Sequence, residues 1–238
     1  MIIIKTGKGG DFVEKKYYEA YDDRYRQVHG ENLQWFADEA SPVVGEVLNR
    51  FSIPRSAKIL EIGCGEGRDA GALMDQGYDV LATDVSPAAI EYAGKRFPSF
   101  QERFQVLDCL REQLNQKFDF LYAVAVVHML VLQEDRDGFY RFLREHLKED
   151  GLALICSMGD GQMERQSDVA VAFECQERIH GQSGKKVLIA GTSCRMVSWP
   201  HFTEEILRNG LCIVESGMTA VEPDFPVMMY AVVKREEA

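Results

Sequence analysis

The sequence predicts a single α/β domain in which a largely parallel sheet carries helices on both faces. From Pro54 onward, short apolar runs alternate with helical patterns, as expected of strand–helix units in a parallel sheet. The run 120–127 is apolar on both faces, which is typical of a strand buried between two layers of helices. A length of 238 residues, with 46% hydrophobic and 27% charged residues, suits one folded domain with a substantial core.

The elements follow in a regular order. A strand over 58–62 leads to a short helix over 69–76 that Gly77 ends, and a second strand covers 79–83. Ser86 is placed to cap the next helix, with Pro87 in its first position and Pro98 at its end. Further strands are predicted over 104–107, 118–126, 152–156, 211–216 and 227–234.

Two more helices complete the pattern. Before the strand at 152–156, four apolar residues form one helix face, namely Phe139, Phe142, Leu143 and Leu147. Before the strand at 211–216, Thr203 is expected to cap a helix that ends at Gly210. In that helix Phe202 is expected to pack against Leu207.

Two segments lie outside the alternation. Residues 1–50 are polar and aromatic and are predicted to form a helical segment in front of the main domain at 51–238. Tyr17, Tyr18, Tyr21 and Tyr25 recur at about one helical turn, which favours one buried helix face. Residues 158–200 form an insertion long enough to indicate a function, and its runs 186–190 and 194–198 are predicted to pair as extra strands.

Charge and cysteine content exclude several classes of protein. Twenty-seven Lys and Arg against 38 Asp and Glu give a net charge of −11, which argues against binding nucleic acid or an anionic membrane. The longest nearly apolar run, 120–132, is too short to span a bilayer, and the N-terminus lacks a secretory signal. The six cysteines lie at least 18 positions apart, so no metal site is expected. We expect reduced thiols in a cytoplasmic protein.

The chemistry is predicted at a glycine-rich turn. Gly63, Gly65 and Gly67 follow a strand and precede a helix, so the backbone there can approach a ligand closely. Ligands of open α/β sheets bind beyond the carboxyl ends of the strands. A dinucleotide fingerprint needs a glycine three positions after Gly65, where this chain has Arg68.

Two acidic residues follow the next strands. Asp84 ends the second strand, 21 positions after Gly63, where a carboxylate can accept both hydroxyls of a ribose. Asp108 ends the third strand, next to Cys109, and can accept from an adenine amine. Each aspartate alone fits a turn cap, but three features at three consecutive strand ends indicate a nucleoside-containing ligand.

With these residues the chain resembles the class I S-adenosylmethionine-dependent methyltransferases. The resemblance runs from about Leu33 to the C-terminus and is carried by the sequences at 60–67, 83–87, 107–108 and 147–151. It implies a Rossmann-like, doubly wound sheet of seven strands with the last one antiparallel. The pattern is most similar to small-molecule branches of the thiopurine and tellurite type.

The resemblance also implies the site residues. The cofactor would be S-adenosylmethionine, with Gly63 and Gly65 at its methionine part, Asp84 at the ribose and Asp108 at the adenine. Residues 1–50 would cover it through Trp35, although packing of an added helix explains Trp35 equally well. The remaining implied cofactor contacts are Glu61, Cys64, Arg68, Val85, Cys109, Val124, Ala125 and Met129.

A methyl acceptor would lie beyond the fourth strand. His128 follows that strand and is the candidate general base, with packing or orientation as the alternative. Arg195, Trp199 and His201, near the end of the insertion, are candidate acceptor contacts.

The predicted function is therefore in-line methyl transfer to a small molecule. Two alternatives remain from the sequence: an NAD(P)-dependent oxidoreductase, and a non-catalytic module that binds S-adenosylmethionine. The sequence leaves the acceptor open, together with the choice between monomer and dimer.

Overall fold

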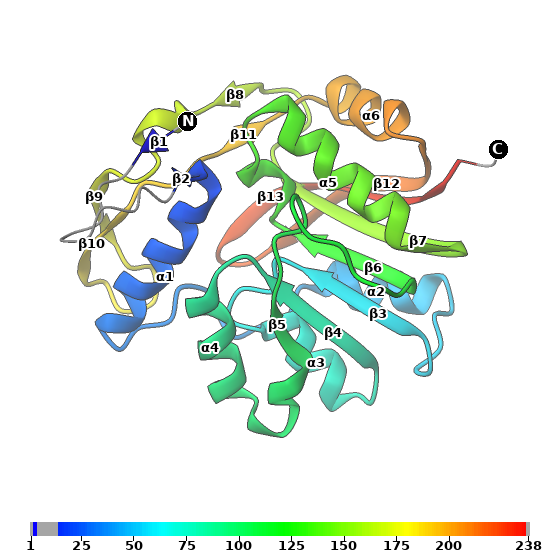
Figure 1. Cartoon of the computed structure of the whole chain (residues 1–238), viewed down its shortest axis with the longest axis horizontal. Helices are drawn as coiled ribbons and strands as arrows, with labels where there is room; N and C mark the ends of the chain where they lie inside the picture. Colours follow the sequence, from blue (N-terminus) through cyan, green and yellow to red (C-terminus); the bar gives the residue numbers. More distant parts are fainter. Residues whose placement is uncertain (1, 4–13, 237–238) are drawn as a thin grey trace.

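The computed structural model describes residues 2–3 and 14–236, and its centre is a seven-stranded sheet. The strands are β3 (Lys58–Ile62), β4 (Asp79–Asp84), β5 (Phe104–Val106), β6 (Phe118–Val124), β7 (Leu147–Met158), β12 (Leu211–Val221) and β13 (Phe225–Arg235). Their order is β12-β13-β7-β6-β3-β4-β5 (Figure 1). Strands β3 to β7 pair in parallel, and β13 is antiparallel to both of its neighbours. The predicted sheet with an antiparallel last strand is confirmed.

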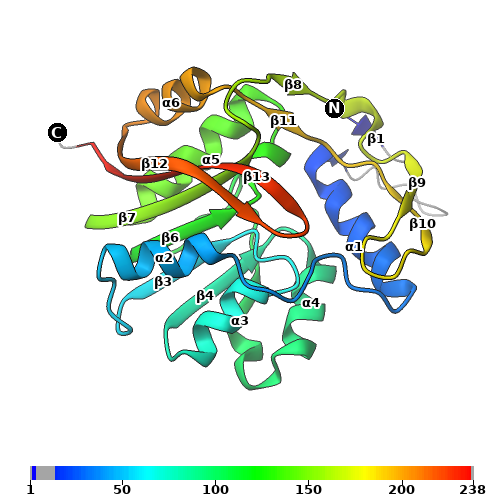
Figure 2. The ribbon, with the colours of Figure 1, turned by 180° about the vertical axis from the view of Figure 1, so that it is seen from behind.

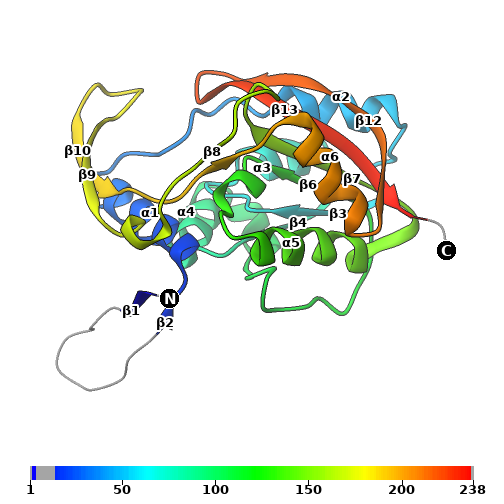
Figure 3. The same cartoon turned by 90° about the horizontal axis from the view of Figure 1, so that it is seen from above.

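Helices cover both faces of this sheet. Apolar residues of α2 (Pro42–Arg50) and α3 (Arg68–Asp75) pack on one face, and Ala93 of α4 (Pro87–Arg96) joins the same core. Helices α5 (Gln133–His146) and α6 (Trp199–Arg208) pack on the other face. Figure 3 shows α5 and α6 on one side of the sheet and α2 on the other. Short 3-10 turns join the elements at η1 (Tyr17–Glu19), η2 (Pro98–Arg103), η3 (Val127–Met129) and η4 (Val169–Val171).

The predicted start of α4 is confirmed, whereas that of α6 is wrong. Ser86 Oγ accepts the Ala89 N–H at 3.1 Å, with Pro87 in the first turn. Helix α6 begins at Trp199, four residues before Thr203, because Pro200 fits a first turn that needs no N–H from it. Thr203 is therefore not the cap, and Phe202 does not act as a staple outside the helix but is a core residue.

The insertion forms two small ladders. Its strands are β8 (Arg165–Gln166), β9 (Cys175–Ile179), β10 (Lys186–Ala190) and β11 (Arg195–Met196). The two predicted runs are strands, but they do not pair with each other: β10 pairs with β9, and β11 pairs with β8. A tight turn, in which the His180 N–H donates to Lys185 O at 2.8 Å, makes β9 the nearer partner of β10.

The N-terminal segment lies against this insertion. Its elements are β1 (Ile2–Ile3), β2 (Glu14–Lys15), η1 and α1 (Ala20–Gly30), while residue 1 and residues 4–13 lie outside the described part. Helix α1 runs beside the β9–β10 hairpin when the molecule is seen from the front and from behind (Figures 1 and 2). Gln27 Oε1 accepts the Ala190 N–H at 2.7 Å. Two segments far apart in the sequence thus adjoin at one end of the sheet.

Within the described residues, no helix is long and apolar enough to cross a membrane.

Two helical glycines give a test of the packing of α2 and α3. A Cβ added at Gly71 would overlap the ring of Phe97, whereas one added at Gly45 meets nothing within 4 Å. We predict that Gly71→Ala lowers the free energy of unfolding by about 1–3 kcal/mol through overpacking. Gly45→Ala should raise it by about 0.5–1 kcal/mol through helix propensity. Urea denaturation measures both, and equal effects of the two substitutions would contradict this packing.

Candidate active site

A cavity lies at the carboxyl ends of β3, β4 and β6. All the residues predicted as cofactor contacts line it except Trp35: Glu61, Gly63, Cys64, Gly65, Arg68, Asp84, Val85, Asp108, Cys109, Val124, Ala125 and Met129. We call this space the first cavity. The sheet brings these residues together because the carboxyl ends of parallel strands meet at one edge.

The glycine turn forms the floor of the first cavity. Gly63 and Gly65 have positive φ values of +71° and +53°, which L side chains rarely adopt. A Cβ at Gly65 would lie 2.6 Å from the Tyr25 hydroxyl. The turn therefore needs glycine both for its conformation and for the close approach of other atoms.

Asp84 fixes the shape of this turn. Its Oδ2 accepts the Gly65 N–H and its Oδ1 accepts the Ser86 N–H, each at 2.8 Å. Burial raises the pKa of Asp84 to about 6, although these N–H donors act to lower it. The carboxylate is thus ionised at neutral pH, and because each oxygen can accept more than one hydrogen bond it can still take further donors.

Two further acidic side chains, Asp108 and Glu61, line the first cavity. Asp108 Oδ2 accepts the Tyr18 hydroxyl at 3.0 Å, and Oδ1 accepts the Leu110 N–H at 3.0 Å. Glu61 Oε2 is buried without a well-formed hydrogen bond among the described residues. Burial, together with the nearby Asp69, raises the pKa of Glu61 well above its usual range. A positively charged group in the cavity would relieve both conditions.

The end of β6 is locally strained. Ala125, which lines the first cavity, has a φ of +60° and donates its N–H to Cys156 O at 3.1 Å. Such a conformation is uncommon outside glycine and is concentrated at functional sites. It ends the strand and starts the loop that carries η3 and His128.

Aromatic residues that were not predicted as ligand contacts close the first cavity. Tyr18, Tyr21 and Tyr25 come from η1 and α1, Phe36 from the segment after α1, and Phe225 from the start of β13. The tyrosine spacing was the signal available, but a buried packing face has the same spacing. Tyr17, Tyr18 and Tyr25 are buried, as predicted, and Tyr18, Tyr21 and Tyr25 also line the first cavity.

The position of Trp35 corrects one prediction. Glu66 Oε1 and Oε2 accept the N–H groups of Trp35 and Phe36 at 2.7 and 3.0 Å. These bonds fix the backbone so that Phe36 lines the first cavity, whereas Trp35 lies under the Arg24 guanidinium, 4.8 Å away. Of these two residues, Phe36 is therefore the one that lines the first cavity.

A second, more open cavity of about 710 Å³ lies between the N-terminal segment and the insertion. It shares four wall residues with the first cavity: Tyr21, Phe36, Met129 and Phe225. We call these four residues the partition. Ligands in the two cavities would thus be separated only by a few aromatic and thioether side chains.

His128 lines the second cavity. It is 3% exposed, and its Nδ1 accepts the Met158 N–H at 3.4 Å. Burial, with a contribution from the positive charge of Arg136, lowers the pKa of His128 to about 3. The neutral ring therefore carries its proton on Nε2 when Nδ1 accepts, and acts as a donor. Among the described residues, no group of three or more His, Cys, Asp or Glu is arranged to hold a metal ion.

Comparison with known proteins shows similarity to methyltransferases. A family model described as a methyltransferase domain matches residues 60–153. A malonyl-[acyl-carrier protein] O-methyltransferase of Acetivibrio thermocellus is 28% identical over 146 residues, 58% of this chain and 50% of that protein. The probable S-adenosyl-L-methionine-dependent methyltransferase TehB of Haemophilus influenzae is 26% identical over 113 residues, 47% of this chain and 39% of that protein. The chain thus spans half the length or less of these curated relatives.

The fold comparison agrees. The 1,6-didemethyltoxoflavin-N1-methyltransferase of Burkholderia thailandensis, solved with 1,6-didemethyltoxoflavin and S-adenosylhomocysteine, superposes with a TM-score of 0.66. It is 15% identical, and the match covers 99% of this chain and 94% of that one. The chain is thus similar to the S-adenosylmethionine-dependent methyltransferase family in sequence over residues 60–153 and in fold.

The walls of the first cavity fit the cofactor of this family. S-adenosylmethionine carries a sulfonium and an ammonium against one carboxylate, so it is a net cation. The first cavity offers the unpartnered Glu61 oxygen and the ionised Asp84, together with a glycine floor that a Cβ would fill. These features match a cationic nucleoside in charge and shape.

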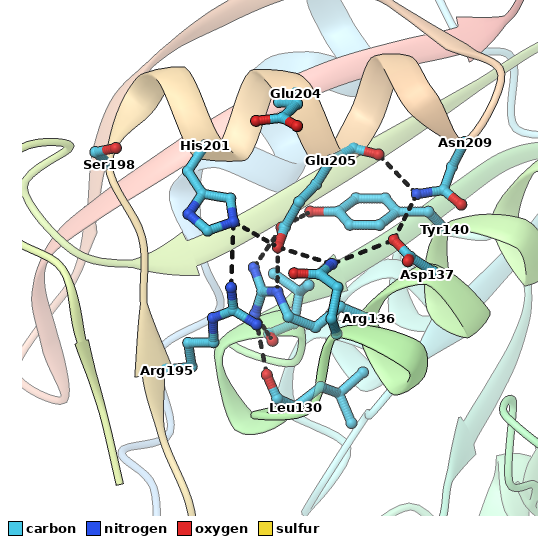
Figure 4. Close-up of polar contacts among 12 residues, drawn as sticks. Leu130, Arg136, Asp137, Tyr140, Arg195, Ser198, His201, Glu204, Glu205 and Asn209 are labelled. Atoms are coloured by element: carbon cyan, nitrogen blue, oxygen red, sulfur yellow. Dashed lines mark hydrogen bonds and ion pairs between the residues drawn. The ribbon is translucent and has the colours of Figure 1, made fainter.

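The residues predicted to contact the acceptor lie elsewhere. Arg195, Trp199 and His201 line neither the first nor the second cavity. Arg195 donates to Val131 O at 3.0 Å. It also contacts His201 Nε2 at 3.1 Å (Figure 4). Trp199 packs on Phe202, with ring centroids 5.9 Å apart. The β8–β11 ladder explains Arg195, because its side chain alternates with that of Met196, which faces the second cavity.

Arg136 holds the loop that carries His128. Its side chain is 0% exposed and donates to Val127 O at 2.6 Å and Leu130 O at 3.1 Å. It also forms a two-pronged pair with Glu205 of α6, at 2.7 and 2.6 Å (Figure 4). Burial acts to raise the pKa of Glu205, but the hydrogen bonds and charge of Arg136 hold it below its usual value. This ion pair thus links α5 and α6 to the wall of both cavities.

A test of this ion pair uses charge removal. We predict that Glu205→Gln lowers the free energy of unfolding by about 3–5 kcal/mol, because the Arg136 charge would stay buried without its counter-charge. Glu91→Gln is the matched control, since its pair with Lys95 is exposed, and it should leave stability unchanged. Urea denaturation at pH 7 measures both. A Glu205→Gln protein as stable as the wild type would contradict the role given to this pair.

Proposed function

We propose that this chain transfers the methyl group of S-adenosylmethionine to a small-molecule acceptor. The observation that carries the proposal is the pair of cavities that share the partition Tyr21, Phe36, Met129 and Phe225. One cavity suits the cationic nucleoside, and the other leaves room for an acceptor. A shared wall is what direct transfer between two bound molecules requires.

The cofactor is assigned to the first cavity. Asp84 would accept the ribose hydroxyls, Asp108 and Cys109 would lie at the adenine, and the glycine turn would lie at the methionine part. The bound sulfonium supplies the electrophilic methyl group. Residues 1–50 would cover it through Phe36 and the tyrosines of η1 and α1, which exclude water.

The acceptor is assigned to the second cavity, which the insertion and α1 enclose. The toxoflavin-type neighbour holds a small molecule beside S-adenosylhomocysteine, which supports the same class here. The net charge of −11 disfavours nucleic acid as the acceptor. All six cysteines are free thiols, which supports the cytoplasm as the site of action.

The residues of the two cavities contribute to methyl transfer mainly by positioning the cofactor and the acceptor. The ionised groups and aromatic walls orient two molecules and keep water out, which supplies most of what an in-line displacement needs. His128 is assigned an orienting role, in which its Nε2–H donates to the acceptor. A non-catalytic binding module is the remaining alternative.

Turnover separates the two possibilities. Incubation of the protein with S-adenosylmethionine and a fractionated metabolite extract should yield S-adenosylhomocysteine in an acceptor-dependent way. Binding of the cofactor with no S-adenosylhomocysteine from any fraction would favour the binding module.

The cofactor assignment predicts the effect of two substitutions. Asp84→Ala should weaken S-adenosylmethionine binding by about 1.5–3 kcal/mol, the usual value of hydrogen bonds to a charged group. Gly65→Val should abolish binding, because the branched side chain would fill the floor of the cavity. Calorimetry measures both. Asp79→Ala, at the opposite end of β4, is the control and should bind normally; normal binding by all three folded variants would exclude the assignment.

The orienting role of His128 predicts a particular pH profile. With its pKa near 3, the ring is neutral throughout the working range, so kcat should show no acid limb from His128 between pH 5 and pH 8. His128→Asn should keep much of the rate, because an amide also donates. A rate about a hundredfold lower in His128→Asn, with loss of an acid limb seen in the wild type, would instead identify a general base.

The same residue should affect stability. The unfolded chain binds the proton at the ordinary pKa of about 6.5, whereas the folded chain does not until about pH 3. Stability should therefore fall as pH falls below about 6.5, and the slope should be smaller in His128→Asn. Urea midpoints at pH 7.5 and pH 5.5 measure the difference.

A further inference from the structure

The second cavity has an unusual charge for this protein. Arg24 of α1, Arg165 of β8 and Arg178 of β9 all line it, in a chain whose net charge is −11. Its wall holds two carboxylates, Glu174 and Asp224. Asp224 is already engaged by Arg68, at 3.2 Å. Positive charge is thus concentrated where the proposed acceptor would bind.

The Arg24 side chain is already engaged in contacts within the protein. Its guanidinium donates to Ala190 O at 3.2 and 3.0 Å and to Gly191 O at 2.7 Å. It also lies over the rings of Trp35 and Tyr21, at 4.8 and 5.3 Å. Arg24 therefore joins α1 to the insertion and adds a fixed charge to the wall.

Arg165 and Arg178, in contrast, are not engaged by other described residues. Neither side chain makes a hydrogen bond or an ion pair with any residue between 14 and 236, and both are exposed. Several other exposed arginines, among them Arg50, Arg103 and Arg111, instead pair with a carboxylate. Two cations without a protein partner thus line the cavity, where a ligand can pair with them.

The rest of the cavity wall suits an apolar body. Arg165 is paired across the ladder with Met196, so both side chains lie on the face toward the cavity. Met158, Trp35 and the partition residue Phe225 add further apolar area. A ligand with an apolar part near the partition and a negative part near the arginines would match both surfaces.

We propose that the acceptor carries an anionic oxygen group, a carboxylate or a phosphate, which Arg165 and Arg178 bind. This inference rests on the proposed function, since it names the class of acceptor for the same site. A guanidinium matches both groups because its N–H donors form a planar fork. A cleft lined by one sign of charge also raises the local concentration of the opposite ion.

Binding of simple probes to the protein saturated with S-adenosylhomocysteine tests this. Calorimetry would compare benzoate and phenyl phosphate with benzamide, which has the same ring without the charge. We expect one or both anions to bind about tenfold or more tightly than benzamide, and the stronger of the two identifies the anionic group. The double variant Arg165→Gln/Arg178→Gln should lose that advantage and leave benzamide binding unchanged.

A matched control removes the same charge elsewhere. Arg55→Gln/Arg141→Gln changes two exposed arginines that line neither cavity, and it should bind the anions like the wild type. Three results would overturn the inference: no preference for the anions, including no binding of any probe; a preference that survives in Arg165→Gln/Arg178→Gln; or an equal loss in the control.

Failure of the proposed function would be read separately. Cofactor binding without S-adenosylhomocysteine formation from any metabolite fraction would exclude methyl transfer, whatever the probes show. Acceptor-dependent formation of S-adenosylhomocysteine together with one of the three results above would retain methyl transfer and exclude only the anionic acceptor.

Discussion

The Glu66 carboxylate joins the glycine turn to the N-terminal segment, and both cavities depend on it. It is 2% exposed, accepts the N–H groups of Trp35 and Phe36, and contacts His29 Nε2 at 2.9 Å. Because these bonds fix two successive residues, Phe36 enters the partition while Trp35 supports Arg24 in the other wall. A buried carboxylate with three donors is fully satisfied, so the connection carries no penalty of an unpaired charge.

Neighbouring acidic residues repeat this arrangement. Asp69 of α3 accepts both the Ser41 N–H and the Ser41 hydroxyl, at 2.6 and 2.7 Å. Asp22 of α1 accepts the Ser86 hydroxyl at 2.7 Å and the Ala88 N–H at 3.0 Å, at the start of α4. Carboxylates thus attach the N-terminal segment to the sheet domain at several points, of which these are three. These carboxylates both hold the N-terminal segment over the site and bring negative charge close to it.

The fold was predictable because its signals are local. Alternating apolar runs, the Ser86 cap and the turn at Gly63 each determine an element from a few adjacent residues, and the sheet then aligns their carboxyl ends. The features that sequence reasoning missed depend on long-range contacts. Phe36 rather than Trp35 lines the first cavity because Glu66 fixes the backbone there, and Arg195 points away from the second cavity because of the way β11 pairs with β8. For the tyrosines of α1, packing against a core and lining a ligand cavity produce the same spacing.

The charges of the two cavities together restrict how an acceptor can lie. The ionised Asp84, together with Asp108, makes the first cavity acidic, whereas Arg165 and Arg178 stand without protein partners in the second. An anionic group near the partition would face the acidic side, and moving it toward the arginines lowers its electrostatic energy at both ends. The apolar partition also offers no hydrogen bond to replace the water such a group would lose. An acceptor with one charged end is therefore held with that end away from the methyl donor and its uncharged end toward it. The acidic first cavity repels the charged end of the acceptor and the arginines attract it. Together they favour one orientation of the acceptor, although neither group contacts its reacting atom.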